Sequence, residues 1–231
     1  ILKKMNIDDQ IQMIGKIGST KQETEMLLEL LADPVYEFRI AAFNNLKTRA
    51  NTIQEQVVAL FSATNADQRY WGMRLLIAAG EEAAGAVEIC VRHAEFSLQR
   101  LGVEALGKWQ KKSSIGVLIE LLGSSNWQLR QSVFKALEGY GDEILDPISR
   151  VLLTDNEDLF YWGLRLLGKL GHKSRKSLVK LLREAPPQRK RLILSALAEC
   201  GDRESLTILL DSLANSDLMA KRSSEAILRV G

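Results

Sequence analysis

The amino-acid sequence predicts an all-α protein, an α-solenoid in which two-helix units follow one another along the chain. The first observation is an apolar marker residue that returns in steps of 30 to 32, at Ile14, Leu46, Leu76, Leu106, Leu137, Leu167, Leu197 and Ile227. The second is a glycine four residues after the marker in six of these eight units. The third is a local copy, because YWGMRLL at 70–76 returns as YWGLRLL at 161–167, three periods later. Such a period is typical of arrays whose units bury their apolar faces only against their neighbours.

The first helix of each unit, helix A, is clearest over residues 33–46. Asp33 can accept hydrogen bonds from the first amides of this helix, and Pro34 suits its first position, where no N–H is needed. Later units open with comparable residues, namely Asn65, Asn126, Asp155 and Ser216. The glycine after the marker is expected to end helix A in a left-handed conformation.

The second helix, helix B, follows within a few residues and carries aliphatic residues at helical spacing. These apolar strips lie at 27–31, 57–61, 87–91, 118–122, 148–152, 178–182 and 209–213. Seven complete A–B pairs and one unpaired helix A, over about residues 217–230, account for the chain. We therefore expect one repeat array over residues 1–231, with no linker and no strand.

Two further columns of helix A are informative. Small residues stand four before the marker and would let neighbouring helices approach closely, at Ala42, Gly72, Gly102 and Gly163. Basic residues stand seven before the marker, at Arg39, Arg69, Arg130 and Lys190, whereas Ile7, Gln99, Phe160 and Ala220 depart from this pattern.

The combination of Asp33, Arg39, Ala42 and Leu46 resembles the HEAT repeat, in its short form named after phycobilisome lyases. The resemblance extends over the chain from about residue 7. It implies a right-handed superhelix of about seven and a half two-helix repeats, in which the B helices line the concave surface. It implies no particular activity, because the shared pattern is structural.

Composition and the chain ends limit the classes of protein to consider. With 46% hydrophobic and 26% charged residues, the chain has the composition of an ordinary soluble folded protein. The longest uncharged stretch, 56–66, is too short to cross a bilayer, so any membrane attachment would come from sequence outside this chain. The first residue is Ile1 and the last, Gly231, falls in the middle of a repeat, so we expect a piece of a longer protein.

The two cysteines are predicted to be free thiols. Cys90 and Cys200 lie almost four repeats apart, which at typical helix spacing corresponds to on the order of 30 Å. A disulfide requires Cα atoms within about 7 Å. Free thiols favour a reducing, cytoplasmic location, either for the chain itself or as the cytoplasmic part of a larger or membrane-anchored protein.

The sequence contains no recognisable catalytic constellation. Two segments, 102–108 and 163–169, approach a phosphate-binding loop, but they lack the final Ser or Thr and lie inside predicted A helices. The two histidines, His93 and His172, have no cysteine or carboxylate partners at metal-ligand spacing. We therefore expect no metal, no cofactor and no enzymatic activity.

Aromatic residues in helix A have two interpretations. Trp71 and Trp162 occupy a mostly apolar column, which favours packing between A helices over a role in partner binding. Tyr70 and Tyr161 stand on a more polar column and are the better candidates for exposed partner contacts. Trp127, in the turn before a helix A, is a further candidate.

Charge is distributed unevenly along the chain. Residues 1–110 contain 12 basic and 14 acidic side chains, and residues 111–231 contain 19 and 15. The sixth repeat is the most basic, and on its helix B three cations fall at i, i+4 and i+7 on one face: Lys176, Lys180 and Arg183, with Lys173 just before them. The first repeat has Glu25 and Glu29 at the matching positions. A binding groove that runs from acidic to basic is one interpretation, and a solvated charged face is the other.

The leading hypothesis is a non-catalytic scaffold whose charged concave groove binds another protein or a peptide. The resemblance leaves two alternatives, a DNA-binding protein like the HEAT-like alkylpurine DNA glycosylases and a bilin lyase. A net charge of only +2 disfavours nucleic acid as the partner. The helix predicted at 217–230 has no helix B to cover it, so we expect either missing sequence or self-association to cover its apolar edge.

Overall fold

The computed structural model describes residues 6–152 and 154–214, and every regular element in these ranges is helical. The chain divides between Ser114 and Ile115 into two compact units, which are described separately. The all-α prediction is confirmed for the described residues. The helix predicted at 217–230 lies outside them.

Unit 1 contains seven α-helices in its described part. They are α1 (Ile7–Gly15), α2 (Lys21–Leu30), α3 (Tyr36–Lys47), α4 (Gln54–Ala59), α5 (Ala66–Ala79), α6 (Ala84–His93) and α7 (Phe96–Trp109). Short 3-10 segments adjoin them at η2 (Ala50–Thr52), η3 (Leu60–Ser62), η4 (Gly80–Ala83) and η5 (Lys112–Ser114).

Unit 2 continues the same alternation in the part that the structure describes. Its helices are α8 (Ile115–Leu122), α9 (Trp127–Glu138), α10 (Leu145–Val151), α11 (Glu157–Lys169), α12 (Arg175–Glu184), α13 (Pro187–Cys200) and α14 (Arg203–Ala214). Its 3-10 segments are η6 (Gly141–Ile144) and η7 (Gly171–Ser174). Odd-numbered helices are the predicted A helices and even-numbered helices the predicted B helices, so the expected alternation is confirmed within each unit.

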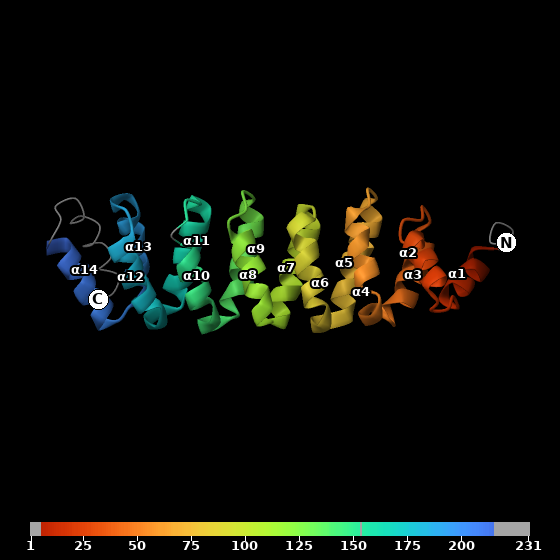
Figure 1. Cartoon of the computed structure of the whole chain (residues 1–231), viewed down its shortest axis with the longest axis horizontal. Coiled ribbons are helices and arrows are strands. Elements are labelled where there is room, and N and C mark those ends of the chain that lie inside the picture. The colour runs from red at the N-terminus through yellow and green to blue at the C-terminus, as the bar shows by residue number, and fades with distance from the viewer. Residues whose placement is uncertain (1–5, 153, 215–231) are drawn as a thin grey trace. The chain divides into compact units, whose positions relative to one another are not determined.

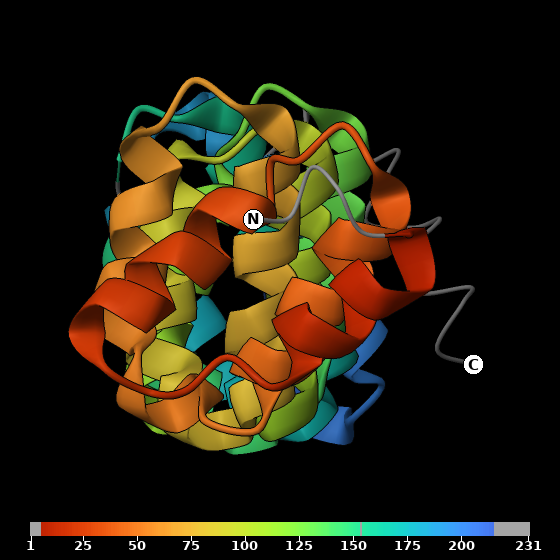
Figure 2. The same ribbon diagram turned by 90° about the vertical axis from the view of Figure 1, so that its right-hand side faces the viewer.

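Within each unit the helices form two layers, one of A helices and one of B helices. In unit 1, α3 packs between α1 and α5, α5 packs on α7, and α4 packs on α6; Figure 2 shows this unit end-on. In unit 2, α11 packs between α9 and α13, and α10 packs between α8 and α12, as Figure 1 shows. The marker residues are buried between the layers, with Leu46, Leu76, Leu106, Leu137, Leu167 and Leu197 all fully inaccessible to solvent. This burial is the main stabilising contribution expected for stacked repeats.

The starts of the A helices confirm some of the predicted caps and correct others. Asn65 and Asn126 are N-caps, and their side chains accept hydrogen bonds from amides of the first helical turn. The prediction for Asp33 and Pro34 is wrong by two residues, because α3 begins at Tyr36 and Asp33 accepts from the amide of Val35 in the preceding turn. The prediction for Asp155 is wrong by one residue, since Asn156 caps α11. Ser216 lies outside the described residues.

The small-residue column brings helix A against the preceding helix B. A Cβ atom added at Gly102 would overlap the Val91 side chain of α6, and one added at Gly163 would lie 2.5 Å from a methyl carbon of Leu152. Each helix pair is packed so closely here that alanine would require a shift. The predicted close approach is therefore confirmed at these positions.

The backbone conformation explains why glycine recurs in the column after the marker. Gly80, Gly141, Gly171 and Gly201 have positive φ, a conformation that side chains with a Cβ rarely adopt. Gly18 of the same column does not have positive φ, so the predicted left-handed end is wrong for the first repeat. Where this column holds Gln110, that residue also has positive φ, 53°, in the left-handed conformation.

The basic column seven before the marker joins successive repeats. Arg39 donates to the carbonyl of Asp33 in its own turn and to the carboxylate of Asp67 in the next repeat, at 3.0 and 3.1 Å. Arg69 and Arg130 make the same pair of contacts one and three repeats later. Their acidic partners, Glu95 and Asp158, therefore help to hold one repeat against the next.

Candidate functional site

The outer face of α12 in unit 2 carries the basic cluster, defined here as Lys176, Lys180 and Arg183. All three side chains are exposed, whereas Leu178 and Leu181 on the opposite face are buried. Within the described residues, no ion pair involves any member of the basic cluster. Three unpaired cations along one helix face give a positive surface that is available to a partner.

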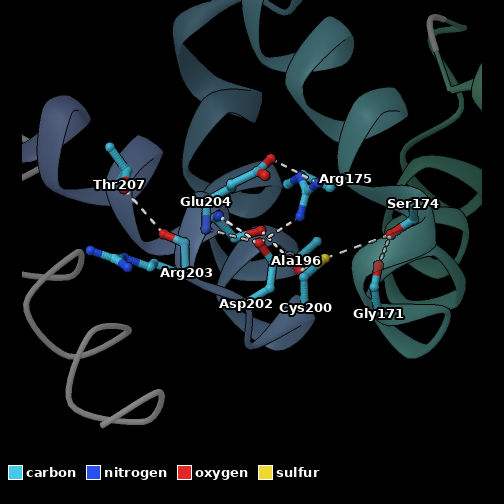
Figure 3. Close-up of polar contacts among 10 residues, drawn as sticks. Gly171, Ser174, Arg175, Ala196, Cys200, Asp202, Arg203, Glu204 and Thr207 are labelled. Carbon is cyan, nitrogen blue, oxygen red and sulfur yellow. Dashed lines mark hydrogen bonds and ion pairs between the residues drawn. The ribbon is translucent and has the colours of Figure 1, made fainter.

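Lys173, which was predicted with these residues, is engaged within the protein. Its ammonium group lies 3.0 Å from the carboxylate of Asp142. Arg175, which belongs to the same basic segment, pairs with Asp202 at 2.6 Å and with Glu204 at 2.8 Å (Figure 3). The number of free cations is therefore smaller than the sequence suggests, because two of the positive charges join neighbouring elements of the fold.

The contacts around Asp202 have a capping role (Figure 3). Its carboxylate accepts from the amides of Glu204 and Ser205 and from the Ser205 hydroxyl, at the start of α14. Burial raises the pKa of Asp202, but the contacts from Ser205 and Arg175 outweigh burial and hold this pKa below its ordinary value. Asp202 is therefore an ionised cap of a helix.

The cysteines are free thiols, as predicted, and neither has the features of a nucleophile. Burial raises the pKa of Cys90 to about 12. Burial also raises the pKa of Cys200, whose sulfur donates to the carbonyl of Ala196 and lies 3.6 Å from the hydroxyl of Ser174 (Figure 3). A raised pKa lowers the fraction of thiolate, the reactive form.

The B helices of unit 1 present acidic side chains instead. Glu25 and Glu29 on α2 are exposed as predicted, and Glu55 of α4 is exposed as well. Sequence reasoning missed Glu55, although it stands one 30-residue period after Glu25 and the repeat register would have found it. Met26 and Ile89 on helices of the same layer are 46% and 52% exposed, so this surface combines negative charge with apolar area.

Tyr70 and Tyr161 are 37% and 46% exposed, in agreement with their assignment as contact candidates. Each belongs to a cluster that was not predicted from the sequence. Arg74 lies 5.7 to 5.8 Å from the rings of Phe43, Tyr70 and Trp71. In unit 2, Arg165 lies 5.1 to 5.9 Å from the corresponding rings, those of Phe134, Tyr161 and Trp162. The copied segment at 70–76 and 161–167 was the signal for this arrangement.

The tryptophans differ in their exposure. Trp71 is buried, as expected for packing between A helices, and Trp162 is half-buried. Trp127 is the first residue of α9 and is 59% exposed. Trp127 thus remains a contact candidate, whereas Trp71 contributes to the core.

A cavity of about 570 Å³ in unit 1 is lined by residues of α1, α3 and the turns that follow them, among them Ile17, Asn45 and Arg49. The Asn45 amide donates to three carbonyls at the end of α1, including those of Ile14 and Ile17, and Arg49 donates to the Gly18 carbonyl at 2.6 Å. These polar groups serve to terminate α1. Among the described residues, no group of three or more potential metal ligands is found, and no helix has the length and apolar character needed to cross a membrane.

Comparison with known proteins supports the repeat assignment. Residues 83–162 match the model of the HEAT repeats family. No curated protein sequence matches the chain significantly.

One similar solved structure is an engineered protein with 17% identity and a TM-score of 0.41. The match covers 90% of this chain and 68% of the engineered protein. The Escherichia coli protein YibA has 13% identity, with coverage of 98% and 97% and a TM-score of 0.39. A designed armadillo repeat protein in complex with the peptide (KR)4 has 17% identity, with coverage of 90% and 100% and a TM-score of 0.35.

The matched residues extend from Ala83 to Trp162, and the same helix pairs with the same marker column continue on either side of them. Residues 83–162 are therefore HEAT repeats, and the described helices on either side of them follow the same two-helix pattern.

Proposed function

We propose that this chain is a non-catalytic scaffold that binds another protein or a peptide through the outer faces of its B helices. The observation that carries the proposal is the basic cluster on α12, whose three cations are exposed and unpaired within the described residues. Repeat arrays commonly use such helix faces as extended binding surfaces. Complementary charge would select an acidic segment of the partner.

Internal ion pairs reduce the number of basic residues that can belong to the proposed site. Lys173 and Arg175 are paired with carboxylates of unit 2, so their substitution would disturb the fold as well as the surface. Lys176, Lys180 and Arg183 can be changed without breaking a described ion pair. The proposed site is therefore narrower than the basic segment of the sequence, and it can be tested directly.

The test uses fluorescence anisotropy with a labelled 16-residue polyglutamate peptide and the full chain. Reversing all three charges, Lys176→Glu, Lys180→Glu and Arg183→Glu, should weaken binding about tenfold or more. The control reverses three exposed lysines of unit 1, Lys47, Lys108 and Lys112, which changes the net charge equally. This control should weaken binding by less than about threefold at physiological salt, where distant charges are screened.

An equal loss of affinity in both triple variants would show that net charge, not the basic cluster, attracts the peptide. Unchanged binding in the α12 variant would overturn the site. Once a cellular partner is identified by crosslinking, the same pair of variants tests whether that partner uses α12.

The acidic surface of unit 1 gives an independent test of the scaffold proposal. Glu25, Glu29 and Glu55 are exposed, and within the described part of unit 1 no ion pair involves them. A labelled polylysine peptide should bind the full chain, and replacing the three acids by glutamine should weaken this binding about tenfold. Retention of full affinity would remove this surface from the proposal.

A further inference from the structure

The outer surface of the A helices in unit 2 has properties that the proposed B-helix site does not use. Its centre is Arg165 of α11, an exposed arginine surrounded by the rings of Phe134, Tyr161 and Trp162. The ring centres lie 5.5, 5.9 and 5.1 Å from the guanidinium carbon, within the range of cation–π attraction. Phe134 packs against Trp162 at 5.5 Å, so residues of two adjacent A helices hold the arginine.

The N–H groups of Arg165 remain free for another ligand. Among the described residues no hydrogen bond and no ion pair involves its side chain. In the equivalent cluster of unit 1, Arg74 donates to the Tyr70 hydroxyl at 3.0 Å. The guanidinium of Arg165 is thus restrained through its contacts with the rings, while its planar fork of donors is unused. Such a fork matches a carboxylate in a bidentate geometry.

The surroundings of Arg165 are positively charged and partly apolar. Exposed Lys135, Lys169 and Arg191 lie on α9, α11 and α13, and no ion pair involves them within the described residues. Two of the four acids of these helices are paired, Asp158 with Arg130 and Glu157 with Arg189. The other two, Glu138 and Glu199, are exposed and leave an excess of positive charge beside the four cations.

Exposed rings accompany this charge. Trp127 begins α9 and is 59% exposed, and Phe134 follows it by seven residues, on the same face of that helix. Tyr161 is 46% exposed. Exposed aromatic rings beside an arginine are typical of the positions that contribute most to protein interfaces.

We infer that the A-helix face of unit 2, centred on Arg165, is a second docking surface, whose partner is an acidic protein segment that also contains an aromatic residue. A carboxylate of the segment would accept from the Arg165 fork. Its aromatic side chain would pack against Tyr161 and Trp127. The flanking cations would attract the segment before these contacts form.

This surface is tested apart from the B-helix site by using the Lys176→Glu, Lys180→Glu, Arg183→Glu variant as the background. The probe is a labelled 12-residue peptide of alternating Glu and Phe, and binding to the full chain is followed by anisotropy. Arg165→Gln should weaken binding about tenfold, and Arg165→Lys should restore only a small part, because lysine keeps the charge but lacks the fork. Arg74→Gln is the matched control from unit 1 and should change affinity less than about twofold.

A second variant guards against a folding effect of Arg165 substitutions. Gln131 is exposed on α9, in the column that holds Tyr161 on α11, and Gln131→Glu places a repelling charge on the surface without removing a described contact. This variant should weaken binding about threefold or more while the thermal unfolding curve stays unchanged.

Three outcomes would overturn the inference. The first is equal loss of affinity in the Arg165→Gln and Arg74→Gln variants. The second is binding of a 16-residue polyglutamate peptide as tightly as the Glu–Phe peptide, which would remove the aromatic part. The third is displacement of the peptide by a 12-nucleotide oligo-dT at lower concentration than by unlabelled peptide, which would indicate a single-stranded nucleic acid site instead. If the α12 cluster does not bind polyglutamate, these three measurements can still be interpreted, because they are made on a chain whose α12 charges are already reversed.

Discussion

Arg130 of α9 and Asp158 of α11 are joined by a 3.0 Å hydrogen bond that links one repeat to the next. Arg130 also donates to the carbonyl of Ser124 in its own turn. Arg39 makes the same two contacts in unit 1, with Asp67 as its acidic partner. The basic column of the repeat is therefore a structural device, and its arginines are not part of the binding surfaces proposed above.

Replacing Arg130 by glutamine should destabilise the protein by about 1–3 kcal/mol, because the part-buried carbonyl of Ser124 loses its charged donor. Lys135→Gln, on the same helix but exposed, should change the free energy of unfolding by less than about 0.5 kcal/mol. Urea unfolding followed by circular dichroism measures both. A loss after Arg130→Gln no larger than that of the control would show that the contacts add no net stability.

Gly102→Ala should destabilise the protein by about 1–3 kcal/mol, because the added Cβ overlaps the buried Val91 side chain. Gly85 of α6 is the matched control, since a Cβ there meets nothing within 4 Å. Gly85→Ala should stabilise by about 0.5–1 kcal/mol through helix propensity. Thermal unfolding distinguishes the two signs. The double variant Val91→Ala, Gly102→Ala should lose at least about 0.5 kcal/mol less stability than the sum of the two single losses, because the smaller side chain makes room for the added Cβ.

Gln110→Gly should stabilise the protein by about 0.5–1 kcal/mol, because Gln110 occupies a left-handed backbone conformation that costs a glycine nothing sterically. The reverse change at an equivalent position, Gly171→Ala, should destabilise by a similar amount. Denaturant midpoints measured for both variants test the prediction. A loss of stability in Gln110→Gly would mean that the glutamine side chain contributes more than its backbone strain costs.

Asp202→Asn should destabilise the protein at neutral pH, with an effect that decreases in acid. The pKa of Asp202 is lowered in the folded protein, so its ionised form stabilises the fold above the unfolded pKa of about 3.9. This contribution is lost as the pH falls through the lowered folded value. Unfolding free energies measured from pH 7 downward should therefore converge for the two proteins in acid.

Glu204→Gln provides the control for this pH series. Glu204 also pairs with Arg175, but its side chain is 75% exposed, and the loss of its charge should cost less than about 1 kcal/mol. If the difference between the parent protein and Asp202→Asn stayed constant from neutral pH to acid, the ionised carboxylate would not be the source of the stabilisation.

The sequence by itself determined the architecture of the repeats. The marker column from Ile14 to Leu197 predicted which side of each helix is buried, because helical spacing alone defines a face. The glycine column predicted positive φ correctly at Gly80, Gly141, Gly171 and Gly201, since few residues other than glycine adopt positive φ without strain. Exposure of Tyr70 and Tyr161 followed from the polarity of their column. All of these are local or periodic properties of the chain.

Only the tertiary structure decided which charged residues are free. Lys173 and Lys176 look equivalent in the sequence, yet Lys173 pairs with Asp142 and Lys176 has no ion pair within the described residues. The same holds for Arg165, whose guanidinium contacts rings from two helices and makes no hydrogen bond within the described residues. Ion pairs and ring contacts form between residues that folding brings within a few ångströms, and their separations in the chain vary. The period therefore identifies the faces of the helices, and the packing of neighbouring repeats decides which charges on those faces can meet a partner.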